Sequence, residues 1–153
     1  VVAPTISTAK DFLLLAAGEV ATLPTVRSVT FTTSRLGRLV YRPQFSVARS
    51  EKITMDGMEI PPSLGLGTAL NFQPTGMGKA AITGDFVLRA SEVNPVIRAL
   101  RKNNIAVTAL HSHMLTEEPR LFFMHFWAVD DALTLAHGLR EALDQTGSVK
   151  PSK

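Results

Sequence analysis

Residues 91–129, SEVNPVIRALRKNNIAVTALHSHMLTEEPRLFFMHFWAV, decide the fold. They begin with a predicted helix, whose N-cap we expect at Ser91 and whose first turn contains Glu92. Two strands are predicted to follow, over residues 105–114 and 121–129, with a turn between them. The helix prediction rests on the i, i+3, i+4, i+7 spacing of the apolar residues Val93, Val96, Ile97 and Leu100.

Residues on either side of this stretch complete the predicted order of elements. A strand is predicted over residues 79–88, where Gly84-Asp85 indicates a bulge or a close approach of another chain segment. A second amphipathic helix is predicted after the cap Asp130-Asp131, and Asp56-Gly57 predicts a tight hairpin. The order β-α-β-β-α predicts an α+β fold, an antiparallel sheet with two helices on one face in a ferredoxin-like arrangement.

Composition excludes several classes of protein. The chain has 153 residues, 45% of them hydrophobic, which fits one globular domain. It contains no cysteine, which excludes disulfides, thiolate zinc sites and a cysteine nucleophile. Its Lys and Arg residues between 10 and 49 are scattered with few aromatics, so we predict no nucleic-acid partner. No apolar run is long enough to span a membrane.

Three histidines form the constellation with the clearest chemical content. His111 and His113 are two residues apart in the first predicted strand of the hairpin, so they share one face. His125 lies in the partner strand and is expected opposite His111. Three imidazoles with an open fourth position can hold zinc, copper or iron, so we predict a transition-metal site. The competing interpretation is a structural cluster, because Phe123 and Trp127 share the face of His125.

Other side chains near the hairpin are candidates for supporting roles. Glu117 or Asp85 could act as a fourth ligand, or as a base to a water on the metal, which makes them the candidate catalytic residues. Arg120 could bind an anionic ligand with its planar fork, or simply pair with Glu117. Trp127 could form the apolar wall of a ligand pocket. The sequence therefore leaves open a metal-binding domain, which could be an enzyme, a non-catalytic module for a small ligand or protein partner, and a structural half-domain.

Several stretches of the chain are familiar from a known family: residues 57–63, 71–76, 84–88, 92–96, 107–115, 117–120 and 122–127. In these stretches the chain resembles the LppY/LpqO family of bacterial proteins, whose biochemical function is not established. The resemblance covers the expected domain, residues 44–146, which follows a poorly defined segment 1–43 and precedes a tail 147–153. It implies an exported, periplasmic or extracellular protein, although no signal peptide is evident in the sequence. Family members commonly contain two similar halves, and this chain resembles the second, which implies a homodimer or a paired half-domain.

Overall fold

A five-stranded antiparallel sheet dominates the structure, a computed structural model that describes residues 32–33, 39–40 and 44–148. Its strands are ordered β3-β6-β7-β9-β8 across the sheet, and each pairs antiparallel with its neighbours. Their bounds are β3 (Gln44–Val47), β6 (Thr68–Gly76), β7 (Lys79–Arg89), β8 (Ala106–His111) and β9 (Leu121–Asp131). β8 is an edge strand, and its outer hydrogen-bonding edge has no strand beside it among the described residues.

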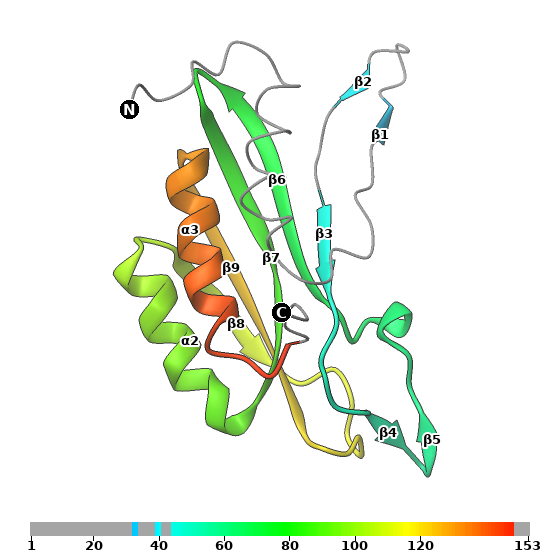
Figure 1. The fold of residues 1–153 in the computed structure, drawn as a ribbon. Helices are drawn as coiled ribbons and strands as arrows, with labels where there is room; N and C mark the ends of the chain where they lie inside the picture. Colours follow the sequence, from blue (N-terminus) through cyan, green and yellow to red (C-terminus); the bar gives the residue numbers. More distant parts are fainter. Residues whose placement is uncertain (1–31, 34–38, 41–43, 149–153) are drawn as a thin grey trace, which may run out of the picture.

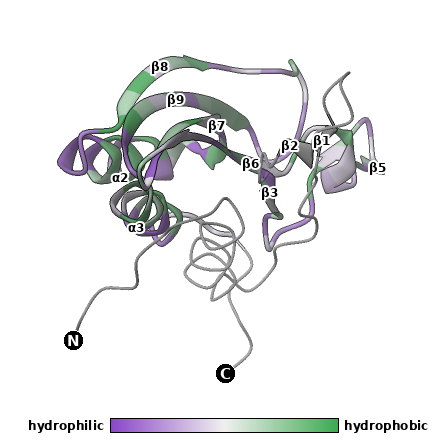
Figure 2. Ribbon diagram, turned by 90° about the horizontal axis from the view of Figure 1, so that it is seen from above, coloured by the Kyte–Doolittle hydropathy of each residue, from purple (hydrophilic) through white to green (hydrophobic). Residues whose placement is uncertain are grey.

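The two described helices cover one face of this sheet, as Figures 1 and 2 show. They are α2 (Ala90–Lys102), which follows β7, and α3 (Ala132–Leu143), which follows β9. Because β9 lies between β7 and β8 and is antiparallel to both, β7 and β8 run parallel with α2 connecting them. This is a split β-α-β unit, and it confirms the predicted α+β class and the ferredoxin-like β-α-β-β-α order.

The main core lies between the sheet and the helices. Alternation along β9 sends Met124 and Phe126 into this core, while Phe123, His125 and Trp127 point to the opposite face. Leu135 and Leu139 of α3 are buried against the sheet, as the apolar face of the second predicted helix requires. The histidine-bearing face is thus the one that the two helices leave uncovered.

Three local predictions are corrected by the structure. The N-cap of α2 is Arg89 rather than Ser91, and Glu92 closes a capping box by accepting a hydrogen bond from the Arg89 N–H at 2.7 Å. β7 runs through Gly84 and Asp85 without interruption, but the predicted close approach is confirmed. A Cβ at Gly84 would collide with the Ala69 carbonyl oxygen of the neighbouring strand.

The third correction concerns the hairpin that carries the histidines. Its first strand, β8, ends at His111 rather than at residue 114, so the connection 112–120 is longer than predicted. His111 is paired with Phe123, and His125 is paired with Ala109. The predicted register, which paired His111 with His125, is therefore wrong by two residues. A shift of two residues keeps the side chains of both histidines on the same face of the sheet.

A small lobe lies beside the end of the sheet, built from β4 (Thr54–Met55), β5 (Met58–Glu59) and the short helix η1 (Pro62–Leu64). The β4–β5 hairpin confirms the turn predicted at Asp56-Gly57. A second apolar cluster joins this lobe to the helix-free face of the sheet. Its buried members are Ile53, Leu66, Val87, Leu121 and Phe123.

Two further strands, β1 (Thr32–Thr33) and β2 (Leu39–Val40), pair with each other. Most of the expected segment 1–43 and of the tail 147–153 lies outside the described residues. Within the described part, no helix has the length and apolar character needed to cross a bilayer.

Candidate metal centre

The structure brings the three predicted histidines together at the edge of the sheet. His111 is the last residue of β8, His113 lies in the loop just beyond it, and His125 lies in β9. One ring nitrogen from each histidine falls within a group whose members are all within 4.8 Å of one another. The Nε2 atoms of His111 and His125 are 2.8 Å apart. No other group of three or more His, Asp or Glu side chains in the described part of the chain approaches this closely.

The ring of His113 is held by stacking. It lies parallel to the buried ring of Phe123, with 3.5 Å between the ring centroids and 15° between the planes. Burial lowers the pKa of His113 below its ordinary value near 6.5; the neighbouring charge of Asp85 raises it, while those of His111 and His125 lower it further. A lowered pKa keeps the imidazole neutral at pH 7, which is the protonation state in which histidine binds metals.

His125 is oriented by the backbone of the adjacent strand. Its Nδ1 atom lies 3.3 Å from the carbonyl oxygen of Gly84, close enough for a long hydrogen bond in which Nδ1–H donates. Nε2 then keeps its lone pair and faces the Nε2 atom of His111. Metal-binding histidines in proteins commonly donate their other ring N–H to a backbone carbonyl or a carboxylate in this way.

Asp85 stands next to the histidines. It is the cross-strand partner of His125, so both side chains point to the helix-free face. Its Oδ1 atom is buried and has no hydrogen-bond partner among the described residues. Burial raises the pKa of the Asp85 carboxyl, although the three nearby histidines act in the opposite direction. A buried carboxylate oxygen without a donor costs free energy. A nearby cation or a hydrogen-bond donor would reduce that cost.

Glu117 and Arg120 are placed in the loop 112–120 rather than in the histidine group. The Glu117 side chain is 1% exposed, and its Oε1 atom accepts a hydrogen bond from the Leu121 N–H at 3.0 Å. Arg120 lies 3.4 Å from Glu117 and also donates to loop carbonyl groups, which is the pairing that the sequence analysis kept as the alternative to ligand binding. Trp127 is 49% exposed on the helix-free face, two residues beyond His125.

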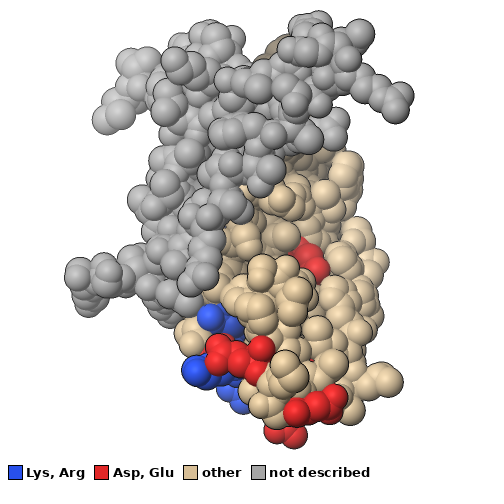
Figure 3. All heavy atoms as spheres, turned by 90° about the vertical axis from the view of Figure 1, so that its right-hand side faces the viewer, with Lys and Arg blue, Asp and Glu red and all other residues tan. Residues whose placement is uncertain are grey.

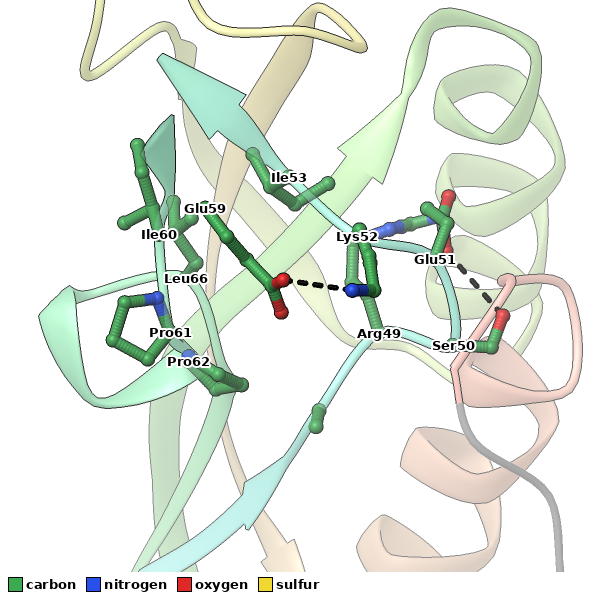
Figure 4. A pocket seen from close by; sticks show the side chains of 11 residues that line it. Arg49, Ser50, Glu51, Lys52, Ile53, Glu59, Ile60, Pro61, Pro62 and Leu66 are labelled. Atoms are coloured by element: carbon green, nitrogen blue, oxygen red, sulfur yellow. Dashed lines mark hydrogen bonds and ion pairs between the residues drawn. The ribbon is translucent and has the colours of Figure 1, made fainter. Parts of the chain in front are cut away.

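A separate pocket of about 370 Å³ lies between the lobe and residues 48–53, the segment that follows β3 (Figure 4). Its apolar wall includes Ile53, Ile60 and Leu66. Two further lining residues, Lys52 and Glu59, form an ion pair with 2.9 Å between Nζ and Oε2. Figure 3 shows that basic and acidic side chains mix at this end of the molecule, while most of the other described surface on that side is uncharged.

The lining of this pocket includes a buried arginine, Arg49, whose role the sequence did not reveal. The Arg49 guanidinium donates to both carboxylate oxygens of Glu92, at 2.8 and 3.0 Å, to Glu51 at 2.6 Å and to the Val87 carbonyl at 2.7 Å. Glu92 also accepts a hydrogen bond from the Gly147 N–H at 2.6 Å. These bonds tie α2 to two distant segments of the chain. Nothing in the local sequence around Arg49 indicates such a network.

The described fold and site define an α+β domain with a three-histidine cluster on its helix-free sheet face. The chain belongs to the family described as Domain of Unknown Function (DUF1259), whose family model matches residues 29–145. It matches no curated protein and no solved structure.

Proposed function

We propose that this domain binds a transition-metal ion through His111, His113 and His125. The observation that carries the proposal is the convergence of three ring nitrogens within 4.8 Å, with His111 and His113 exposed rather than packed into a core. Zinc, copper and iron all accept imidazole ligands, and a three-histidine set leaves at least one coordination position open.

The close approach of His111 and His125 supports this proposal. With 2.8 Å between their Nε2 atoms, the two rings direct two nitrogens toward nearly the same point. A metal ion held there would use the lone pairs of both nitrogens. Because histidine binds metals in its neutral form, metal binding is expected to strengthen with rising pH.

We further propose that Asp85 rather than Glu117 is the acid that assists this site. The Asp85 side chain shares the face of His125, and its carboxylate is near enough to interact electrostatically with all three histidines. A metal held by the histidines would supply Lewis-acid chemistry, and the Asp85 carboxylate would be the base closest to it in the sheet. Glu117 is occupied by its bonds within the loop.

Elemental mass spectrometry on protein purified without a histidine tag tests the metal proposal. We expect close to one equivalent of metal in the wild type and none in the folded double variant His111→Ala/His113→Ala. His137→Ala is the matched control, since His137 is an exposed histidine of α3, a helix on the opposite face of the sheet. Wild-type protein that stays free of metal after incubation with zinc, copper and iron would refute the proposal.

The second candidate is a module that binds a small ligand or a partner protein without catalysis. The half-exposed Trp127 beside the histidines favours it, because an aromatic ring next to polar groups is a common recognition surface. The occupied guanidinium of Arg120 weakens the expected anion clamp. A metal-free wild type whose tryptophan fluorescence responds to a ligand would select this alternative.

The finer predictions drawn from the LppY/LpqO resemblance also stand as proposals. We propose that this family name applies to the chain, that the domain is exported, and that it pairs with a second copy or a similar half-domain. Light scattering on purified protein tests the pairing, and a single monomeric species at high concentration would refute the homodimer.

A further inference from the structure

The loop that carries His113 is held in place by an arginine of the same loop. The Nη1 atom of Arg120 lies 3.1 Å from the Met114 carbonyl oxygen and 2.9 Å from that of Leu115. These are the two carbonyl groups that directly follow His113. A single guanidinium nitrogen therefore fixes the backbone beside this histidine, although His113 itself lies outside the ordered ladder of β8.

A buried carboxylate anchors the other end of the same loop. Oε1 of Glu117 accepts a hydrogen bond from the N–H of Leu121, the first residue of β9, and Oε2 lies 3.4 Å from Arg120. The next residue, Glu118, exchanges two backbone hydrogen bonds of 2.8 Å with Thr54 of the lobe. The loop is thus connected both to β9 and to the β4–β5 hairpin.

We propose that Glu117 and Arg120 are positioning residues that hold His113 in the geometry required for metal binding. This inference rests on the proposed metal site. A loop without these bonds would sample many conformations, and fixing His113 on binding would cost conformational entropy. The two charged residues remove part of that cost before the ion arrives, because they order the backbone at residues 114, 115 and 121.

The burial of Glu117 supports a dedicated role. A carboxylate that is 1% exposed is unfavourable unless donors satisfy it, and here a backbone N–H and a guanidinium do so. The positive charge of Arg120 remains 46% exposed and touches none of the three histidines. Its effect on a metal ion must therefore pass through the loop that it holds.

Copper(II) provides the test, because electron paramagnetic resonance can count the imidazole nitrogens bound to it. We expect three in the wild type and two in both His113→Ala and Arg120→Ala. The dissociation constant of copper should rise about tenfold in Arg120→Ala, the lower end of the effects seen when residues around metal ligands are changed.

Arg98→Ala, which removes an exposed arginine of α2, is the matched control and should retain three nitrogens. Glu117→Gln retains an acceptor for Leu121 and is expected to fall between wild type and Arg120→Ala.

The double variant Arg120→Ala/His113→Ala distinguishes positioning from a general loss of stability. If Arg120 acts through His113, the double variant binds copper as weakly as His113→Ala alone. Additive losses, or three bound nitrogens in Arg120→Ala, would overturn the inference.

The inference also has a readout in the metal-free protein. Stacking on Phe123 should shift the ring protons of His113 upfield in the NMR spectrum, and Arg120→Ala should remove that shift. An unchanged shift would overturn the positioning role. Failure of the wild type to bind any copper would instead refute the metal proposal itself, so the two failures can be told apart.

Discussion

Replacing Asp85 with alanine should make the metal-free protein more stable while it weakens metal binding. The Oδ1 atom of this residue is one of two buried side-chain atoms without a hydrogen-bond partner among the described residues. Removing the carboxylate removes its desolvation cost, and no donor is left unpaired by the change. Residues that assist a functional site often carry such a cost in the unliganded state.

The expected gain in stability of Asp85→Ala follows from the burial of the Oδ1 atom. An unsatisfied buried polar group costs about 1–3 kcal/mol, and the half-buried state of Asp85 favours the lower end, about 1 kcal/mol. For a chain of 153 residues, that free energy corresponds to a rise in melting temperature of about 2–4 °C. Metal affinity should fall by about tenfold or more, as expected when a group beside the ligands is lost.

Thermal unfolding of the metal-free protein, followed by calorimetry, measures the first effect, and competition with a coloured chelator measures the second. Asp144→Ala is the control, because Asp144 is an exposed carboxylate at the end of α3, where it pairs with Arg140. A lower melting temperature for Asp85→Ala, together with unchanged metal affinity, would refute the reasoning, since the carboxylate would then be stabilising the fold.

Three further predictions follow from the same contacts. Phe123→Ala should cost about 3–5 kcal/mol of unfolding free energy in chemical denaturation, because it empties a buried site under His113. Burial by itself would raise the pKa of Glu92, but the hydrogen bonds from Arg49 lower that pKa below its ordinary value near 4.5. Wild-type stability should therefore fall as the pH drops below about 4.5. Glu92→Gln should be less stable at pH 7 and lose less on acidification, which denaturation at pH 7 and pH 3 can compare. Zinc at 100 times its dissociation constant should raise the melting temperature of the wild type by about 5–10 °C, and leave that of His111→Ala/His113→Ala unchanged.

The fold was predictable where local pattern and tertiary structure agree. The apolar spacing from Val93 to Leu100 and the caps at Asp131 describe α2 and α3 as they stand, because each helix buries one continuous face. The N-cap at Ser91 was wrong for a tertiary reason. Glu92 accepts hydrogen bonds from Arg49, and its capping box begins two residues earlier than predicted, at Arg89.

The site was predictable in its residues but not in its geometry. A period of two placed His111 and His113 near each other, although His113 is held by stacking on Phe123 rather than by a strand. The pairing of β8 with β9 was predicted, but its register could not be, because it depends on the length of the loop 112–120 and on an irregularity between Val107 and Ala109. The pairing of Arg120 with Glu117 was one of the predicted alternatives, but the hydrogen bonds of both side chains to the backbone depend on that loop and could not be predicted.

The features that a stable fold does not require gather at one place on this domain. Exposed strand positions such as that of His111 favour β-branched or aromatic residues, yet here two histidine rings face each other with 2.8 Å between their Nε2 atoms. Asp85, on the same face, has a buried oxygen without a donor. Each feature alone has a purely structural explanation, but all of them lie on the face of the sheet that the helices leave open. A cation held by the three histidines would use the converging nitrogens and place a positive charge near the Asp85 carboxylate.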